Sequence, residues 1–256
     1  MIKLREFVLN TEYFIVAHRG SSSTAPENTI AAFSEAIQVK TDMVEADIQL
    51  TSDDKIVSFH DKSLGRTSNG KGLISDYTYD EIKDFDAGSW FNPKFAREKI
   101  PLLSDVIALI KEKLYLNIEI KILPENQRKH QINKILEIIL ESKMDENTLF
   151  SSFDYNALKE IKSFNPKLPT AAIRIPGDKR LPSEIASEIG TEAFVCSRTE
   201  ISEEIYNDAQ TNNIFIGVYS IDTLKHLTEM LKYPIKAIVT NNPARIKKHL
   251  ASNIIG

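Results

Sequence analysis

The chain has 256 residues, a length that suits either one α/β barrel or two smaller domains, each with a sizeable core. Hydrophobic residues make up 42% of the sequence and charged residues 27%, which is typical of a soluble globular protein. The formal net charge of −4 excludes an overall basic field that would draw the chain to nucleic acid or to an anionic membrane, while leaving room for a local basic pocket.

Cysteine content and hydropathy further limit the class of protein that this sequence can encode. The one cysteine, Cys196, excludes an intrachain disulfide and gives no metal–thiolate pattern. It lies in an apolar run, residues 193–196, so we expect it to be a small buried core residue. The N-terminal stretch has no long apolar segment, and no later run reaches the ~18 apolar residues of a membrane span. We therefore expect a cytoplasmic protein without integral membrane contact.

Short apolar runs separated by helix-like segments recur along the chain. The eight strand candidates are, in order, residues 14–17, 43–50, 114–120, 148–153, 170–175, 193–197, 214–219 and 237–240. Between them, apolar residues recur at spacings of three and four, as at Ile30, Phe33 and Ile37, which predicts helices packed on one face. The same spacing predicts helices around 132–139 and at 154–164, 183–189, 201–212, 222–231 and 242–250.

This repeated alternation of strand and helix predicts an α/β fold, a (β/α)₈ TIM barrel formed as a single domain over residues 1–256. A doubly wound open sheet is the alternative. Such a sheet normally has a glycine-rich turn after its first strand, and Gly20 followed by three serines does not match that fingerprint.

The interval from about residue 62 to residue 102 interrupts the alternation of strands and helices. It contains no clean strand–helix unit, and it is rich in glycines and aromatic residues, including Tyr77, Tyr79, Phe85 and Trp90. Loops of this length usually carry function. We predict a small inserted subdomain after the second strand, packed over one end of the barrel, and a cap that only stabilises the barrel is the alternative.

Charged residues occur inside two predicted strands. Glu45, Asp47 and Gln49 share one face of strand 43–50, and Glu119 and Lys121 share one face of the next strand. Because helices cover the outside of a parallel barrel, these side chains should point inward, near its carboxyl-terminal mouth. Each carboxylate pair at ~4 Å would cost about 4 kcal/mol at an effective dielectric near 20. Either a hard divalent cation or a network of salt bridges must offset that repulsion.

Two histidines stand at the ends of early apolar runs. His18 follows the first strand and precedes Arg19, and His60 ends the run 56–60 and precedes Asp61. A lone histidine at a strand end is usually structural, but two in equivalent places indicate an acid/base pair. The remaining histidines lie on predicted helices and are expected at the surface, namely His130, His226 and His249.

The stretch Pro-Glu-Asn-Thr, residues 26–29, leads into the first long helix. Asn28 or Thr29 is the predicted N-cap, because short polar side chains accept hydrogen bonds from the first free backbone amides. Glu27 and Asn28 are interpreted as structural residues rather than ligands.

Four stretches of the sequence occur together in one known family. They read "AHRGSSSTAPENTIAAFSEAI", "VEADIQLTSDDKIVSFHDKSLGRTSNGKG", "IPLLSDVI" and "LNIEIK". In this order and at these separations, they make the chain resemble the glycerophosphodiester phosphodiesterase family from about residue 14 to residue 247. The resemblance is strong over the first 121 residues and loose afterwards. The combination of stretches is highly specific, whereas His-Arg-Gly alone would be weak.

The resemblance implies a (β/α)₈ barrel with a small insertion, and hydrolysis of a glycerophosphodiester to glycerol 3-phosphate and an alcohol. The substrate's own glycerol hydroxyl would attack phosphorus, giving a cyclic phosphate that water then opens. One divalent cation would be bound, Mg²⁺ or Ca²⁺ with Mn²⁺ possible. Carried across position by position, the implied roles are His18 and His60 as the acid/base pair, Glu45, Asp47 and Glu119 as metal ligands, and Arg19 and Lys121 as phosphate contacts.

Two places depart from the family's usual pattern. Tyr219-Ser-Ile-Asp222 stands where the family commonly has Trp-Thr-Val-Asn, and Tyr219 could still form an apolar wall beside the glycerol of the substrate. Thr240-Asn241 stands where Thr-Asp is usual. Both departures fall outside the metal and histidine set, so we expect them to affect substrate preference rather than the chemistry.

Other functions remain alternatives at this point. Lysophospholipase D and related phospholipase-type phosphodiesterases also use two histidines at a barrel mouth, and the aromatic residues of the insertion could bind lipid. A non-catalytic phosphodiester-binding protein is disfavoured, because all seven expected catalytic, metal and phosphate residues are present. The expected partner is a small-molecule glycerophosphodiester and not nucleic acid. The sequence leaves a monomer and a homodimer equally open.

Overall fold

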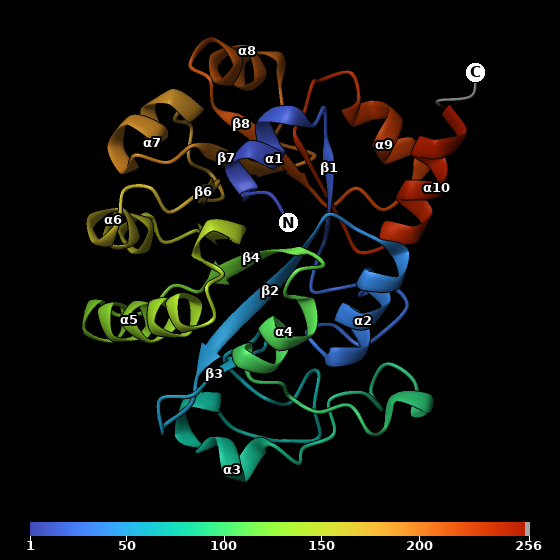
Figure 1. Ribbon diagram of the computed structural model, residues 1–256, viewed down its shortest axis with the longest axis vertical. Helices are drawn as coiled ribbons and strands as arrows, with labels where there is room; N and C mark the ends of the chain where they lie inside the picture. Colours follow the sequence, from blue (N-terminus) through green and yellow to red (C-terminus); the bar gives the residue numbers. More distant parts are fainter. Residues whose placement is uncertain (254–256) are drawn as a thin grey trace.

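The computed structural model describes residues 1–253, and within them eight parallel strands close into a barrel (Figure 1). Closure occurs because β1 pairs with β2 on one side and with β9 on the other. The TIM barrel predicted from the sequence is therefore confirmed. Its strands are β1 (Phe14–Ala17), β2 (Met43–Leu50), β4 (Tyr115–Ile120), β5 (Thr148–Ser152), β6 (Thr170–Ile173), β7 (Ala193–Ser197), β8 (Phe215–Tyr219) and β9 (Ala237–Thr240).

Helices surround the barrel and bury the outward side chains of its strands (Figure 1). Val44, Ala46 and Ile48 of β2, for example, belong to a buried cluster that also contains Phe33 and Val106 from two helices. Most predicted helices match the observed ones to within about three residues at their ends, but the helix predicted around 132–139 begins earlier, at Glu125. The surrounding helices are α2 (Ile30–Val39), α4 (Leu103–Ile110), α5 (Glu125–Glu141), α6 (Tyr155–Phe164), α7 (Pro182–Ile189), α8 (Glu203–Thr211), α9 (Leu224–Met230) and α10 (Pro243–Asn253).

The helices α1 (Leu4–Asn10) and α4 were not predicted, and the run 56–60 was predicted only as a short apolar run that ends at His60. Helix α1 lies over one end of the barrel (Figure 1). There the ring centroids of Phe7 and Tyr115 are 4.7 Å apart. The strand β3 (Ile56–Ser58) pairs antiparallel with β2, on the outer side of the closed sheet. Because β3 runs back along β2, it returns the chain toward the barrel mouth and sets the position of His60, which follows it.

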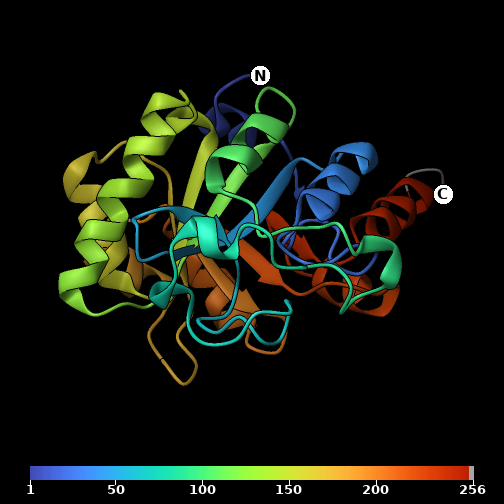
Figure 2. The same ribbon diagram turned by 90° about the horizontal axis from the view of Figure 1, so that it is seen from below.

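The segment between β3 and α4 has a small hydrophobic core of its own. It contains the helix α3 (Tyr79–Ile82) and two single 3₁₀ turns, Ile74–Asp76 and Pro93–Phe95. Figure 2 shows it as the blue-green segment running across the barrel, away from the N-terminal helix. Its core side chains are Val57, Phe59, Leu64, Ile74, Ile82, Ala87 and Ile100.

Two cavities occupy the ends of the barrel. The larger, of about 690 Å³, lies beneath α1, and among the described residues its lining includes none of the predicted site residues. The smaller, of about 210 Å³, is lined by His18, Glu45, His60 and Glu119 and lies at the carboxyl-terminal mouth. We place the site in the smaller cavity, because the chemistry-bearing side chains meet there. Size alone would have pointed to the wrong end.

Two expectations about the chain as a whole can be compared with the structure. Cys196 is fully buried in β7, as predicted, and burial raises the pKa of its thiol to about 12. Over residues 1–253, no helix combines the length and the apolar character that crossing a bilayer requires.

Candidate active site

Three carboxylates from two neighbouring strands meet inside the barrel mouth. The parallel register of β2 and β4 places Asp47 beside Glu119, and Glu45 lies one step earlier on the same face of β2. One oxygen from each of the three lies within 4.8 Å of the others. Glu45 and Asp47 are buried, with 3% and 0% of their surfaces exposed. The alternation read from the sequence therefore does gather these acids at one point.

Two cations hold the most deeply buried of these acids. The ammonium of Lys121 pairs with both Asp47 and Glu119, and Arg19 Nε lies 3.0 Å from Asp47 Oδ2. Burial alone would raise the pKa of Asp47, but the charges of Lys121 and Arg19 outweigh it and hold that pKa well below its ordinary value. Asp47 is therefore ionised, with its negative charge shared between two cations.

Glu45 lacks a comparable partner. Its Oε2 accepts a hydrogen bond of 2.8 Å from the Arg19 backbone N–H, but its Oε1 is buried and has no hydrogen-bond partner within residues 1–253. Burial and the negative charges of Asp47 and Glu119 raise the pKa of Glu45 well above its ordinary value. A buried carboxylate oxygen without a partner is costly. A hard divalent cation, which takes several carboxylate oxygens, would remove that cost, so the donor set fits such an ion.

His60 is anchored through its Nδ1 atom, which lies 2.5 Å from Asp61 Oδ1. Hydrogen bonds from Arg66 lower the pKa of Asp61, so this carboxylate is ionised and can only accept. His60 Nδ1 must therefore carry a hydrogen, which leaves Nε2 as the free nitrogen at the cavity. The side chain of Gln49, on the same face of β2 as the acids, donates a 3.0 Å hydrogen bond to the carbonyl of His60.

His18 is anchored in the same way by a residue at the far end of the chain. Its Nδ1 lies 2.8 Å from Oδ1 of Asn241, because the register of β1 with β9 places Ala17 opposite Thr240. Burial, and then the charge of Arg19, lower the pKa of His18. Asn241 is not one of the predicted metal or histidine residues, but it contacts one of them directly, a contact that was not predicted from the sequence.

The turn after β1 gives His18 and Arg19 their directions. Arg19 has φ of 57° and Gly20 has φ of 77°, both in the left-handed region. A Cβ at Gly20 would lie 2.6 Å from the carbonyl carbon of Ala32 in α2, so only glycine fits there. This tight turn lets the Arg19 backbone reach Glu45 while its side chain reaches Asp47.

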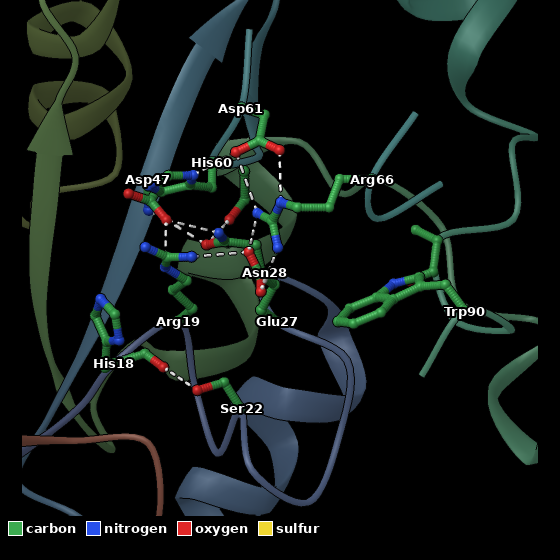
Figure 3. Close-up of polar contacts among 12 residues, drawn as sticks. His18, Arg19, Ser22, Glu27, Asn28, Asp47, His60, Asp61, Arg66 and Trp90 are labelled. Atoms are coloured by element: carbon green, nitrogen blue, oxygen red, sulfur yellow. Dashed lines mark hydrogen bonds and ion pairs between the residues drawn. The ribbon is translucent and has the colours of Figure 1, made fainter. Parts of the chain in front are cut away.

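An ion-pair network joins the two halves of the site (Figure 3). Arg66 donates to Asp61, with Nε 2.6 Å from Oδ2, and to Glu27, with Nη2 2.7 Å from Oε1. Glu27 also accepts a 2.9 Å hydrogen bond from Nη1 of Arg19. Glu27 therefore contacts protein cations, in keeping with the structural role expected for it. Sequence reasoning gave Arg66 no role, although it lies in the stretch that carries His60.

Asn28 fixes the position of Asp47. The residue has φ of 58° and is 2% exposed, and its amide donates a 2.8 Å hydrogen bond to Asp47 Oδ2. The amide oxygen accepts from the Asp47 N–H at 3.2 Å and from Ser58 Oγ at 2.9 Å. The helix N-cap is Thr29, whose side chain accepts from the Ala32 N–H. Of the two predicted N-cap candidates, only Thr29 is therefore the cap. Asn28 instead links the start of α2 to β2 and β3 through its hydrogen bonds with Asp47 and Ser58.

We expect Asn28→Ala to lower the free energy of unfolding by about 2–4 kcal/mol, because it removes hydrogen bonds to a buried ionised carboxylate and puts a Cβ-bearing alkyl residue in a left-handed conformation. Urea denaturation of the metal-free protein measures this loss. Asn133→Ala, on an exposed face of α5, is the matched control and should change stability by less than about 0.5 kcal/mol. Equal stability of the two variants would contradict the role given to Asn28.

Tyr219, at the end of β8, lines the cavity at the barrel mouth, and burial raises the pKa of its phenol to about 12, so its hydroxyl stays neutral. The other histidines do not line this cavity and lie on helices. His130 is exposed and pairs with Asp54, whereas His226 and His249 are half-buried and only partly meet the expectation of surface residues.

Comparison with known proteins now identifies the class. The model of the glycerophosphoryl diester phosphodiesterase family matches residues 18–245. A glycerophosphodiester phosphodiesterase of Caldanaerobacter subterraneus is 34% identical over 90% of this chain and 94% of its own, and one of Bacillus altitudinis is 29% identical over 91% and 96%. The chain belongs to the glycerophosphoryl diester phosphodiesterase family, and with it to the phosphoric diester hydrolases.

A solved structure supports the same assignment at the level of the fold. A phosphodiesterase of Oleispira antarctica, in complex with the product sn-glycerol-3-phosphate, superposes with a TM-score of 0.87 and 28% identity. The match covers 93% of this chain and 96% of that one. The family resemblance predicted from the four sequence stretches is therefore confirmed.

Proposed function

We propose that this protein hydrolyses glycerophosphodiesters to glycerol 3-phosphate and an alcohol, with one divalent cation and two histidines. The observation that carries the proposal is the convergence of Glu45, Asp47 and Glu119 beside a cavity that Glu45 and Glu119 line together with His18 and His60. Family membership supports it, as does the product bound by the structural neighbour from Oleispira antarctica.

The proposed metal ligands are Glu45, Asp47 and Glu119, and the ion is Mg²⁺ or Ca²⁺, with Mn²⁺ possible. These ions prefer carboxylate oxygens, and the Glu45 oxygen without a hydrogen-bond partner in the described chain is the strongest sign of a cation-binding site. When bound, such an ion would supply Lewis-acid stabilisation of the charge that builds on the phosphoryl oxygens.

Arg19 and Lys121 are the proposed phosphate contacts. Both are cationic side chains at the same mouth, and the carboxylates raise the pKa of each even though burial opposes the charge. A phosphodiester carries one negative charge, and more develops on its equatorial oxygens as the nucleophile adds. Fixed positive side chains stabilise that charge without having to reorganise during the reaction.

His18 and His60 are the proposed proton-transfer groups. One removes the proton from the glycerol hydroxyl as it attacks phosphorus, and the other protonates the departing alkoxide, which leaves a cyclic phosphate. Water then opens the ring with the two roles reversed. Each ring is held through Nδ1, by Asn241 and by Asp61, so that Nε2 is the nitrogen free for transfer.

Tyr219 is the proposed wall beside the substrate's glycerol, since it lines the cavity and keeps a neutral ring.

A second candidate function, lysophospholipase D activity, is favoured by one observation. Trp90 is 42% exposed, packs edge-on against Phe91 at 5.6 Å, and lies on the Arg66 side of the site in Figure 3. An exposed indole of this kind, packed on a half-buried phenyl ring, could hold an acyl chain.

The organisation of the protein is part of the proposal. We propose that residues 1–256 act as a single catalytic domain, in which segment 62–102 is an insertion packed beside the site. We place the protein in the cytoplasm, in glycerol and lipid metabolism, as a monomer or homodimer without nucleic-acid partners. Size-exclusion chromatography with light scattering decides the oligomeric state.

Product release from a panel of substrates tests the function, measured as glycerol 3-phosphate from the soluble diesters and as choline and lysophosphatidic acid from the lysolipid. Glycerophosphocholine, glycerophosphoethanolamine and glycerophosphoglycerol are compared with lysophosphatidylcholine, each with Mg²⁺, Ca²⁺ or Mn²⁺. We expect the soluble diesters to be cleaved with the higher kcat/KM. A preference for the lysolipid would move the assignment to lysophospholipase D, and binding of all substrates without turnover would point to a non-catalytic phosphodiester-binding protein.

A further inference from the structure

A carboxylate behind Asn241 determines how that residue faces His18. Asp222, in the loop after β8, accepts hydrogen bonds from the Asn241 backbone N–H at 2.7 Å and from its side-chain Nδ2 at 2.9 Å. It also accepts from Ser220 Oγ at 2.8 Å and Thr240 Oγ1 at 3.1 Å. Burial opposes ionisation, but these hydrogen bonds lower the pKa of Asp222, so it is present as a carboxylate.

An ionised carboxylate can only accept, so the amide nitrogen of Asn241 must face Asp222 and the amide oxygen must face the other way. That oxygen accepts from Ser22 Oγ at 2.9 Å and lies 2.8 Å from His18 Nδ1. An amide oxygen cannot donate, so the hydrogen of this contact must sit on Nδ1. The chain of acceptors therefore fixes His18 as the Nδ1-protonated tautomer, with the lone pair of Nε2 left free.

Positions 222 and 241 both lie in the two stretches that depart from the family's usual pattern, and this chain has a carboxylate at the first and an amide at the second. Asn241→Asp would bring two carboxylates face to face at hydrogen-bond distance, where like charges cannot both stay ionised. Asp222→Asn would no longer hold the nitrogen of the Asn241 amide away from His18, because an amide group can donate as well as accept.

We propose that Asp222 and Asn241 form a carboxylate–amide pair whose function is to position His18, fixing its tautomer through the neutral oxygen of the Asn241 amide. The two residues touch neither substrate nor cation in this account and act only through His18. The inference rests on the proposed function at one point, namely that Nε2 of His18 transfers the proton.

A double-mutant cycle tests whether Asp222 and Asn241 act as a pair. Asp222→Asn and Asn241→Asp should each lower kcat at least about 10-fold with KM changed less than about 3-fold, because an incorrectly presented catalytic histidine loses rate rather than binding. The double variant Asp222→Asn/Asn241→Asp restores the pairing with its members exchanged, and it should recover kcat to within about 3-fold of the original. Losses that simply multiply in the double variant would overturn the proposal.

The tautomer is measured separately by ¹⁵N NMR of the histidine rings. We expect His18 to carry its hydrogen on Nδ1 in the original protein and to lose that preference in Asn241→Leu, with His18→Ala used to assign the signal. A hydrogen on Nε2 in the original protein would overturn the proposal whatever the activity. If the tautomer is as expected but His18→Ala keeps full activity, the proposed function fails while the positioning pair stands.

Discussion

Chelation of divalent cations with EDTA should lower kcat/KM by at least about 100-fold, and Mg²⁺, Ca²⁺ or Mn²⁺ should restore it. The expectation follows from the buried Oε1 of Glu45, which has no partner in the described chain, and from two more carboxylates within 4.8 Å. Lys121 and Arg19 form ion pairs with Asp47, but their side chains form none with Glu45 in the described chain. The cation would supply both a partner for the Glu45 oxygen and stabilisation of the transition state.

The control for the EDTA experiment is a test of whether the chelated protein stays folded. Circular dichroism of the chelated protein should be unchanged, because the barrel is held by backbone pairing between its strands and by the hydrophobic packing of the helices against them. Full activity after exhaustive dialysis against chelator would contradict the metal site. It would favour the alternative considered from the sequence, in which the acids form only a salt-bridge network.

His18→Ala and His60→Ala should each lower kcat by at least about 100-fold without loss of fold, because general acid–base catalysis typically contributes 10²- to 10⁴-fold. Each ring is fixed through Nδ1 and lines the cavity that holds the carboxylates. Combining the two substitutions should cost much less than the product of the single losses, because the residues serve one reaction. Steady-state kinetics with a soluble glycerophosphodiester measures all three variants.

His130→Ala is the matched control for these variants. Its ring lies on α5, with 46% of the side chain exposed, and pairs with Asp54 away from the mouth of the barrel. The substitution should leave kcat within about 2-fold, since surface changes of this kind rarely matter. A loss of 10-fold or less in either His18→Ala or His60→Ala would remove that histidine from the proposed proton transfers.

Most of the fold follows from local sequence patterns. Strands and helices in an α/β barrel are each marked by their own periodicity, so the run 43–50 predicted β2 to the residue and the alternation of runs predicted the barrel. The helices α1 and α4 were not predicted, and the run that contains β3 was noted but is too short to show a period of its own. The segment 62–102 is held by a small core of scattered apolar residues, which no local pattern reveals.

The site was predictable where its residues alternate within a strand or stand at a strand end. Glu45, Asp47 and Glu119 were found in this way, since position in a barrel strand determines the inward direction. The supporting contacts were not found. Asn241 meets His18 only because β9 closes on β1, across 223 positions of sequence, and Arg66 meets Glu27 across 39. Such contacts depend on closure and loop packing, which single-sequence reasoning does not supply.

Binding of Mn²⁺ to the metal-free protein, followed by electron paramagnetic resonance, tests most directly whether acids from β2 and β4 create one cation site between the histidines. We predict one tight Mn²⁺ per chain, displaced by Mg²⁺ or Ca²⁺, and at least about 10-fold weaker binding in Glu45→Gln, Asp47→Asn and Glu119→Gln. Glu204→Gln, on an exposed face of α8, should bind as the original protein does. Absence of a tight site, or a site unaffected by all three carboxylate substitutions, would contradict the account.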